Sequence, residues 1–379
     1  MCVLERSEHL MSETNSSLRV GVIGGTRLPG NVKTFLRNVR DLLEPHPVDF
    51  EFDLLLREAS TVGLSGFQPV DTGIEGTSRA IRTLQTLTTA TTKYARSRPV
   101  DVLFQVTKFP LHGFAATVAG KRTDTPVITR FAGDNFREHV LSDGVGERTR
   151  TFALNNIVGY VPTKFSDATI VLGPHGKSEI RQRNGSQTIH EIPQPVDFDR
   201  FDPVSDRERA TLRNELGIED ETRVVLTVGR LSERKGMADL IDAANSLADR
   251  TVDLRWYVAG DGPFREELLA TPLVEPIGRI PHEQMPDYYR VADVVVHPSH
   301  IEGLPNVLLE AAACGTPTVS RRVGDAETVA SKTYTDTSQL PDLILENHEA
   351  AELGERFAAD TLRKAYAKAL VATATNSRS

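Results

Sequence analysis

Short apolar runs alternate with longer amphipathic stretches along this chain of 379 residues, and the alternation constrains its fold more than any other feature. Strand-length runs separated by helix-length segments are typical of βαβ units, in which helices join parallel strands. The expected strands are 18–23, 48–56, 100–106, 126–131, 168–172, 224–228, 254–259, 291–297 and 316–320. The expected helices are 31–43, 78–98, 237–248, 305–314 and 352–372. The sequence therefore predicts an α/β protein built on parallel sheets.

The alternation runs through two successive series, separated by a polar, charged run at 199–209 that we interpret as an interdomain linker. Each series is long enough to form a domain of its own. We therefore expect two doubly wound domains that face each other. Ligands of such sheets bind beyond the carboxyl ends of the strands, so the expected site is the cleft between the two domains.

The composition excludes several classes of protein. No apolar run approaches the roughly 18 residues that span a bilayer, and residues 1–17 lack the apolar core of a signal peptide, so we interpret them as a disordered tail. Cys2 and Cys314 lie far apart and outside any metal-ligand spacing, which favours a reducing cytoplasm over a disulfide framework. Residues 1–200 carry a net charge of +2 and residues 201–379 one of −10. The acidic second half argues against nonspecific nucleic-acid binding.

The first motif that could bind a ligand or take part in catalysis follows the expected strand 224–228. It reads GRLSERKG over residues 229–236. Gly229 lets the chain turn and lets its backbone approach a ligand. Arg230 and Lys235 lie in the loop before the next helix, where two cations and the free N–H groups of a helix start suit a diphosphate. Fixed cations also stabilise the negative charge that a diphosphate gains as it leaves. The alternative interpretation is a solvated basic loop.

The second motif follows the expected strand 291–297 and reads PSHIEGLPNVLLE over residues 298–310. Pro305 suits the first position of a helix, so the helix start points toward the strand ends with its N–H groups available to an anion. Glu302 precedes this helix and Glu310 lies within it, and their carboxylates could accept hydrogen bonds from sugar and ribose hydroxyls. The alternative is that Glu302 only complements the helix dipole and Glu310 is a surface residue.

Together with VAGDGP at 258–263, these motifs resemble the retaining glycosyltransferases of family 4. Their order and spacing match the family over residues 224–323, and the two glutamates correspond to its Glu-x7-Glu pair. The resemblance implies the GT-B fold, in which two Rossmann-like domains face each other across a cleft. It implies a tail at 1–17, an acceptor-side domain at 18–198, a donor-binding domain at 199–355, and a last segment, 356–379, whose helix crosses back to the first domain before a polar tail.

The resemblance also implies roles for the matching residues. Arg230 and Lys235 would bind the donor diphosphate beside Gly229. Glu310 would accept hydrogen bonds from the ribose hydroxyls, and backbone near Ile280 would face the base.

The donor sugar would be held by Glu302 together with the backbone N–H groups of Gly303 and Leu304. Family members keep the anomeric configuration and need no metal, so the resemblance implies neither a metal site nor a cofactor. The leaving phosphate oxygen would itself take the proton of the acceptor.

The first half of the chain matches the family less closely. Its glycine-rich loop, GGTRLPG at 24–30, follows the first strand, and backbone at Gly24 and Gly25 would approach the donor phosphates or the acceptor. Asn31 stands where a P-loop has its lysine, and the spacing is not Gly-x-Gly-x-x-Gly, so an NTPase and a nicotinamide site are both disfavoured. A structural turn is the alternative.

Many family members carry a histidine just after the strand that corresponds to 126–129, and this chain has none there. Arg130 and Asp134 are the polar groups placed to substitute, on the acceptor or phosphate side. The alternative is that Asp134 caps its loop, and His112 and His139 are further candidates with no better claim.

The resulting prediction is a metal-independent hexosyltransferase that moves a sugar from UDP or GDP to a glycan, lipid-linked or small-molecule acceptor. Its expected place is the cytoplasm, with peripheral membrane contact through the N-terminal domain near Lys33, Arg37 and Arg40. Two other functions stay open: a nucleotide-sugar epimerase of the same fold, and an idle subunit that binds sugar nucleotides. The sequence identifies neither the base, the sugar nor the acceptor.

Overall fold

The computed structural model describes residues 17–25, 28–56, 63–72, 80–142, 144–183, 185 and 188–376, without the side chains of residues 80–82 and 376. Residues 1–16 of the expected tail, and Thr26 and Arg27 of the first glycine-rich loop, lie outside the described residues. The chain forms two compact units. The N-terminal unit contains the residues up to Pro195 and those from Glu355 onward, and the C-terminal unit is Val196–Gly354.

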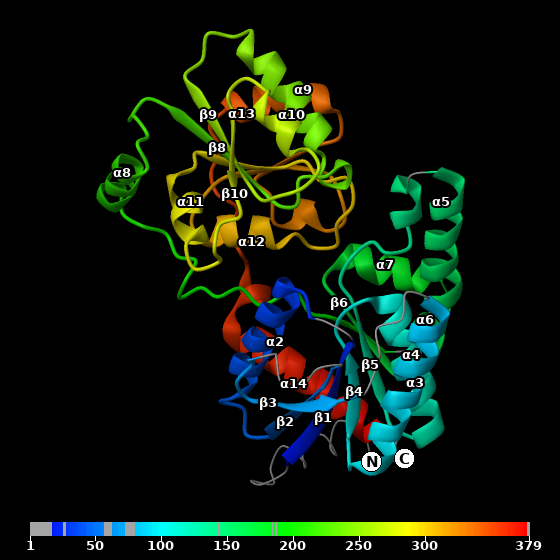
Figure 1. Cartoon of the computed structure of the whole chain (residues 1–379). Helices are drawn as coiled ribbons and strands as arrows, with labels where there is room; N and C mark the ends of the chain where they lie inside the picture. The colour runs from blue at the N-terminus through cyan, green and yellow to red at the C-terminus, as the bar shows by residue number, and fades with distance from the viewer. Residues whose placement is uncertain are drawn as a thin grey trace. The chain divides into compact units, whose positions relative to one another are not determined.

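The N-terminal unit is built on one parallel sheet of seven strands in the order β3-β2-β1-β4-β5-β6-β7 (Figure 1). The strands are β1 Ser17–Gly25, β2 Asp49–Leu56, β3 Phe67–Asp71, β4 Val102–Gln105, β5 Val127–Phe131, β6 Ala168–Val171 and β7 Thr188–Glu191. Strands β4, β5 and β6 are buried along their whole length, as expected for a parallel sheet covered on both faces.

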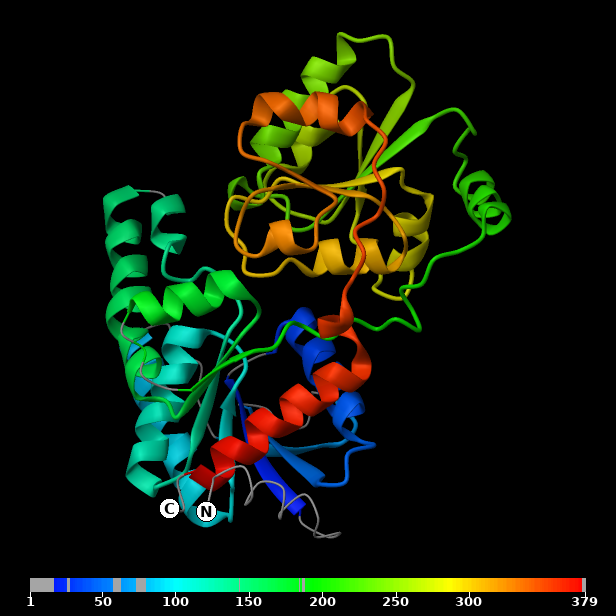
Figure 2. The same ribbon diagram turned by 180° about the vertical axis from the view of Figure 1, so that it is seen from behind.

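Helices cover both faces of this sheet. They are α2 Gly30–Leu43, α3 Ala80–Ser97, α4 Phe109–Thr123, α5 Gly144–Phe152, α6 Tyr160–Phe165, α7 Pro174–Gln182 and α14 Ala359–Asn376. On one face, Leu36 of α2 and Tyr366 of α14 join Val22 of β1 in a single core cluster. On the other face, Ala116 of α4 packs with Leu103 of β4. Figure 2 shows α14 lying across the N-terminal sheet, so the last helix completes the core of the first unit.

The C-terminal unit has a second parallel sheet, of six strands in the order β10-β9-β8-β11-β12-β13. Its strands are β8 Arg223–Val228, β9 Leu254–Ala259, β10 Val274–Gly278, β11 Val294–His297, β12 Thr318–Arg321 and β13 Lys332–Tyr334. Its helices are α8 Asp206–Glu215, α9 Met237–Ala248, α10 Arg265–Leu269, α11 Met285–Val291, α12 Asn306–Ala313 and α13 Leu340–Leu345. Helices α9 and α13 contribute to the core cluster that contains Trp256, and α11 and α12 to the one that contains Tyr257.

Two expected elements were wrong at one end. The expected strand 291–297 begins only at Val294, because Val291 is the last residue of α11 and the intervening Asp293 accepts a hydrogen bond from Val224 N at 2.7 Å. The expected helix 352–372 begins only at Ala359, after a chain segment through Gly354 that links the two units. The polar run 199–209 lies in the C-terminal unit and becomes helical at Asp206.

The strand order of the second sheet decides which loops meet. Chain order reverses between β8 and β11, which pair side by side with Val294 opposite Val225. The helices that follow these two strands pack on opposite faces of the sheet, α9 in the core cluster of Trp256 and α12 in that of Tyr257. The loops that lead into these helices leave the sheet at the carboxyl ends of the strands, where α/β sheets bind their ligands. The two motifs of the sequence are these two loops.

Candidate functional site

The loop after β8 runs from Gly229 to Gly236 and carries both predicted phosphate ligands. Its second half is a 3-10 turn, Glu233–Lys235, and Gly236 then caps the start of α9 with a φ of +71°. A side chain at Gly236 would also meet the carbonyl oxygen of Pro298 at 2.1 Å. Only glycine suits this position, because it tolerates both the left-handed backbone and the close approach. Arg230 is exposed near the beginning of the loop.

Three strand-end loops are packed together at this edge of the sheet. His300 N, in the loop after β11, donates to Arg234 O at 3.0 Å, and Ser299 Oγ donates to the same carbonyl at 3.4 Å. The loop after β9 approaches just as closely, since an ideal Cβ on Gly260 would lie 1.7 Å from Gly229 O. Backbone contacts therefore fix the first motif against both of its neighbours.

Glu302, from the second motif, contacts Lys235 of the first motif. Its Oε1 forms an ion pair with Lys235 Nζ, accepts from Ser299 Oγ at 2.9 Å, and lies 3.5 Å from His297 Nε2. Burial by itself would raise the pKa of Glu302, but the hydrogen bond from His297 and the charge of Lys235 lower that pKa well below its usual range. Glu302 is therefore held as a carboxylate, in contact with the ammonium group of Lys235 from the first motif.

The residues after Glu302 bring the start of α12 to the same place. Gly303 O accepts from Asp325 N at 2.7 Å, which ties this loop to the one after β12, and Leu304 is buried. Pro305 is the N-cap of α12 and not its first residue, so the helix begins one residue later than predicted, at Asn306. The first N–H groups of α12 thus follow Glu302 closely in the sequence, beginning at Asn306.

Glu310, from α12, lines a pocket of about 690 Å³ in the C-terminal unit. Lining residues that matter for recognition are Gly229, Arg230, Asp261, Ile280, His282 and Glu310. Tyr289 OH donates to Glu310 Oε2 at 2.8 Å. Burial raises the pKa of Glu310 to about 7, against the opposing effects of the Tyr289 hydrogen bond and the charge of Arg200.

The structure therefore brings most of the predicted donor-side residues to one edge. Arg230, Ile280 and Glu310 share the pocket, and Lys235 with Glu302 forms the adjoining ion pair. The two groups are contiguous, because an ideal Cβ on Gly229 would lie 4.0 Å from Lys235 Cδ.

In the N-terminal unit, the glycine-rich loop lies against a histidine. Gly25 has a φ of +74°, and an ideal Cβ there would lie 2.4 Å from Cε1 of His112, in the first turn of α4. Burial lowers the pKa of His112 to about 3, with a smaller contribution from the charge of Lys108, so the imidazole is neutral. Gly24 is buried in β1 against β2, where a Cβ would meet Leu56.

Arg130 and Asp134 have separate partners. The guanidinium of Arg130 is buried, lies 3.9 Å from the centroid of the Phe35 ring, and donates to the side chain of Gln194. Asp134 is buried after β5, with Oδ2 3.4 Å from His175 Nε2. Both therefore hold neighbouring elements of the N-terminal unit together.

The sequence model of the family Glycosyl transferases group 1 matches residues 222–372, which include every donor-side residue above. This part of the chain is therefore similar to the group 1 glycosyl transferases. The family 4 resemblance of the three motifs is thereby confirmed for this part of the chain.

Two of the proteins that this chain is similar to are named as a mannosyltransferase and a glycosyltransferase. A GDP-mannose-dependent alpha-(1-6)-phosphatidylinositol monomannoside mannosyltransferase of Mycolicibacterium smegmatis is 35% identical over 195 residues, which cover 45% of this chain and 50% of that protein. A D-inositol 3-phosphate glycosyltransferase of Corynebacterium jeikeium is 39% identical over 150 residues, 36% of each chain. The matches thus span about half, or less, of the length of these relatives.

Solved structures confirm the GT-B fold of this chain. Sucrose-phosphate synthase of Thermosynechococcus elongatus superimposes with a TM-score of 0.72 at 19% identity, over 94% of both chains. HepE of Anabaena, in complex with UDP and glucose, gives a TM-score of 0.64 at 18% identity, over 95% of this chain and 97% of that one. At such identities the likeness shows the fold alone.

Sequence reasoning missed two residues of this candidate site. His297 was interpreted only as the end of a strand, yet it faces Glu302 and its Nδ1 lies 3.2 Å from Ser320 Oγ. Tyr289 was not singled out, yet it is the hydrogen-bond donor to Glu310. The position of His297 as the last residue before the second motif was the available signal, because strand ends point at the ligand edge.

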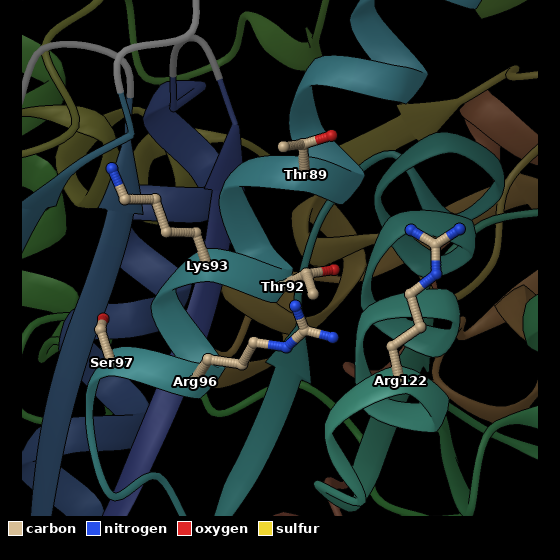
Figure 3. A pocket seen from close by; sticks show the side chains of 6 residues that line it. All are labelled: Thr89, Thr92, Lys93, Arg96, Ser97 and Arg122. Atoms are coloured by element: carbon tan, nitrogen blue, oxygen red, sulfur yellow. The ribbon is translucent and has the colours of Figure 1, made fainter.

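A second pocket, of about 560 Å³, lies in the N-terminal unit between α3 and α4 (Figure 3). Lys93, Arg96 and Arg122 line it from α3 and α4, and Thr89 and Thr92 face it. Arg96 and Arg122 stand in the last turns of their helices, where cations complement the helix dipole. These two charges are therefore explained by the helices that carry them, and none of the site residues predicted from the sequence lines this pocket.

Proposed function

We propose that this chain is a retaining glycosyltransferase that moves a hexosyl group from a UDP- or GDP-sugar to a glycan, lipid-linked or small-molecule acceptor. The observation that carries the proposal is the pocket of about 690 Å³ shared by Arg230, Ile280 and Glu310, with the Lys235–Glu302 ion pair beside it. A cation pair, a ribose-binding carboxylate and a helix start are the groups that a nucleotide diphosphate sugar requires.

The Lys235–Glu302 pair suggests how the donor enters. In the proposed complex the diphosphate replaces the Glu302 carboxylate as the partner of Lys235, and Glu302 then accepts hydrogen bonds from the hydroxyls of the sugar. Lys235 thus keeps an anionic partner, and Glu302 exchanges its ion pair for hydrogen bonds from the sugar hydroxyls, so neither charge is left buried without a partner. Arg230 would contact the diphosphate from the pocket side, and the N–H groups of Gly303 and Leu304 would contact the sugar.

In the proposed reaction, the acceptor oxygen bonds to the anomeric carbon as the bond from that carbon to the diphosphate oxygen breaks. The departing diphosphate oxygen takes the acceptor's proton, and attack from the face it leaves keeps the anomeric configuration. Charge grows on the diphosphate during this step, so Arg230 and Lys235 stabilise the transition state more than the bound donor.

We propose that no metal is needed, because these two cations supply the positive charge. An Asp-x-Asp sequence does occur, at Asp197-Phe198-Asp199, but Asp197 accepts from Arg200 N at 3.3 Å in a local turn. Turnover in excess EDTA is therefore expected to equal turnover with added Mg²⁺ or Mn²⁺. Loss of activity in EDTA that either metal restores would refute this part of the proposal.

The donor is to be identified by a thermal-shift and calorimetric screen of UDP, GDP, ADP and their sugars. The names of the relatives make GDP-mannose one choice, and the HepE complex makes UDP-glucose another. Transfer is then measured with the preferred donor and a panel of phosphoinositol, glycan and lipid-linked acceptors. Epimer formed from the donor alone would favour an epimerase, and donor binding without any transfer would favour an idle subunit.

Nucleotide affinity is expected to fall as the pH falls through 7. Glu310 has a raised pKa of about 7, so it gains a proton below that pH and can then no longer accept from both ribose hydroxyls. If only the carboxylate binds, affinity drops about tenfold between pH 8 and pH 6. Isothermal titration over this range measures the effect. Glu310→Gln should bind weakly and lack the step, and an unchanged step in that variant would remove Glu310 from the ribose site.

A further inference from the structure

The most unusual surface of the N-terminal unit is the helical segment 144–165. Among the described residues, eight large hydrophobic side chains are exposed, and six of them lie between Val140 and Phe165. Helix α5 buries no residue at all. In Figures 1 and 2 it extends beyond the ends of α3 and α4, away from the sheet. It packs against the preceding 3-10 turn Glu138–Leu141, where the rings of His139 and Phe152 lie 5.1 Å apart, but its other exposed apolar side chains are available to something else.

The exposed side chains form one stripe, which we call the α5–α6 ridge. Its members are Val145, Phe152, Ile157, Tyr160 and Phe165. Val145 and Phe152 are seven residues apart, which is two α-helical turns. The next spacing is five residues, and it falls in the π-helical turn Ala153–Val158, whose wider turn returns the chain to the same face. Tyr160 and Phe165 then meet edge to face, with ring centroids 6.3 Å apart.

The opposite face of this segment is anchored. Asn155 Nδ2 donates to Asn135 O at 2.6 Å, and Pro162 packs against Gly113 of α4. Gly159 is required at the π turn, because a Cβ there would meet Asn155 O at 2.1 Å. The segment is therefore fixed on the unit by one side, while Val145 remains 83% and Ile157 66% exposed on the other.

The charges beside the ridge are mainly positive. Residues 144–165 contain three cations, Arg148, Arg150 and Lys164, and one acid, Glu147. Aromatic and aliphatic side chains on one face of a helix, with arginine and lysine at its flanks, are the composition of helices that lie in the interface of an anionic bilayer.

This ridge differs from the cationic helix α2, where sequence reasoning placed the membrane contact. Helix α2 already buries its apolar face, including Phe35, Leu36 and Val39, against the sheet and α14. It has charge to offer a membrane but no apolar stripe to insert. We propose that the N-terminal unit docks on anionic lipid bilayers through the α5–α6 ridge, an inference that does not depend on the reaction catalysed.

The test is binding of the full chain to vesicles, measured by flotation on phosphatidylcholine vesicles with and without phosphatidylglycerol. Wild type should float with the anionic vesicles, and less so at high salt. The double variant Phe152→Ser/Ile157→Ser should lose at least about tenfold in partitioning, because both apolar contacts are removed. The matched control Lys33→Glu/Arg37→Glu on α2 should change partitioning by less than about twofold. Unchanged melting temperatures show that the variants fold.

Insertion can be observed directly with Ile157→Trp, because the single natural tryptophan, Trp256, is buried in the other unit. Its fluorescence should shift to the blue with anionic vesicles only. Failure of wild type to float, or loss of flotation in the α2 control with full retention in the ridge variant, would overturn the proposal. Concentration-dependent dimers that Ile157→Ser dissociates, without vesicle binding, would show that a second copy covers the ridge instead.

Discussion

Replacing Lys235 by alanine is expected to lower kcat/KM for the donor by about 30- to 1,000-fold. One preorganised charge contact to a leaving group contributes about 2–4 kcal/mol to transition-state stabilisation. The loss should appear in kcat as well as in KM, because the diphosphate gains charge only as the glycosidic bond breaks. The substitution also removes the cation that pairs with Glu302, so the pKa of that carboxyl should rise.

Steady-state kinetics with the identified donor measures this effect. Lys93→Ala removes a lysine of the same kind from the pocket between α3 and α4, and its kinetics should match those of wild type. Lys235→Arg should recover part of the activity, because it keeps the charge and changes only the geometry. Activity of Lys235→Ala within twofold of wild type would remove Lys235 from the site.

Replacing Gly260 by alanine is expected to destabilise the C-terminal unit by about 3 kcal/mol or more and to abolish tight nucleotide binding. The new Cβ would lie 1.7 Å from Gly229 O, which is backbone and cannot rotate away. Relief of this clash requires the loop after β8 to move, and that loop carries Arg230 and Lys235. Stability and donor affinity should therefore fall together.

Gly217→Ala is the matched control, because Gly217 also has a positive φ, +66°, but a Cβ there would meet nothing within 4 Å. It should cost only the backbone strain, about 1 kcal/mol, and leave nucleotide affinity unchanged. Denaturant unfolding gives the stabilities, and calorimetry gives the affinities. Equal destabilisation by the two substitutions would mean that the contact between the loops after β8 and β9 does not constrain the site.

The elements that the sequence predicted well are those whose apolar pattern is set by burial. The strand expected at 254–259 is β9 and the helix expected at 237–248 is α9, with the same bounds. Strand β10 was missed because it is only half-buried and contains Pro276, so it shows neither an apolar run nor an alternation. Strand β11 was extended too far because Val291 and Val294 look like one run, although the first belongs to a helix.

The part of the site that depends on which loops follow which strands in the sequence was predictable. Motifs that follow strands had to gather at one sheet edge, and Arg230, Ile280 and Glu310 do so. The ion pair between Lys235 and Glu302 was not predictable, because it depends on the side chains of two loops that meet only once the sheet has formed. The hydrogen bond from Tyr289 to Glu310 escaped prediction for the same reason.

The position of α14 has a consequence during protein synthesis. Leu362, Tyr366 and Leu370 of this helix fill the core beneath the first sheet, yet the ribosome makes them after the whole of Val196–Gly354. The N-terminal unit must wait with an open apolar face while the second unit emerges and folds. A chain halted before Ala359 would expose that face, and we expect chaperones to bind there until translation is complete.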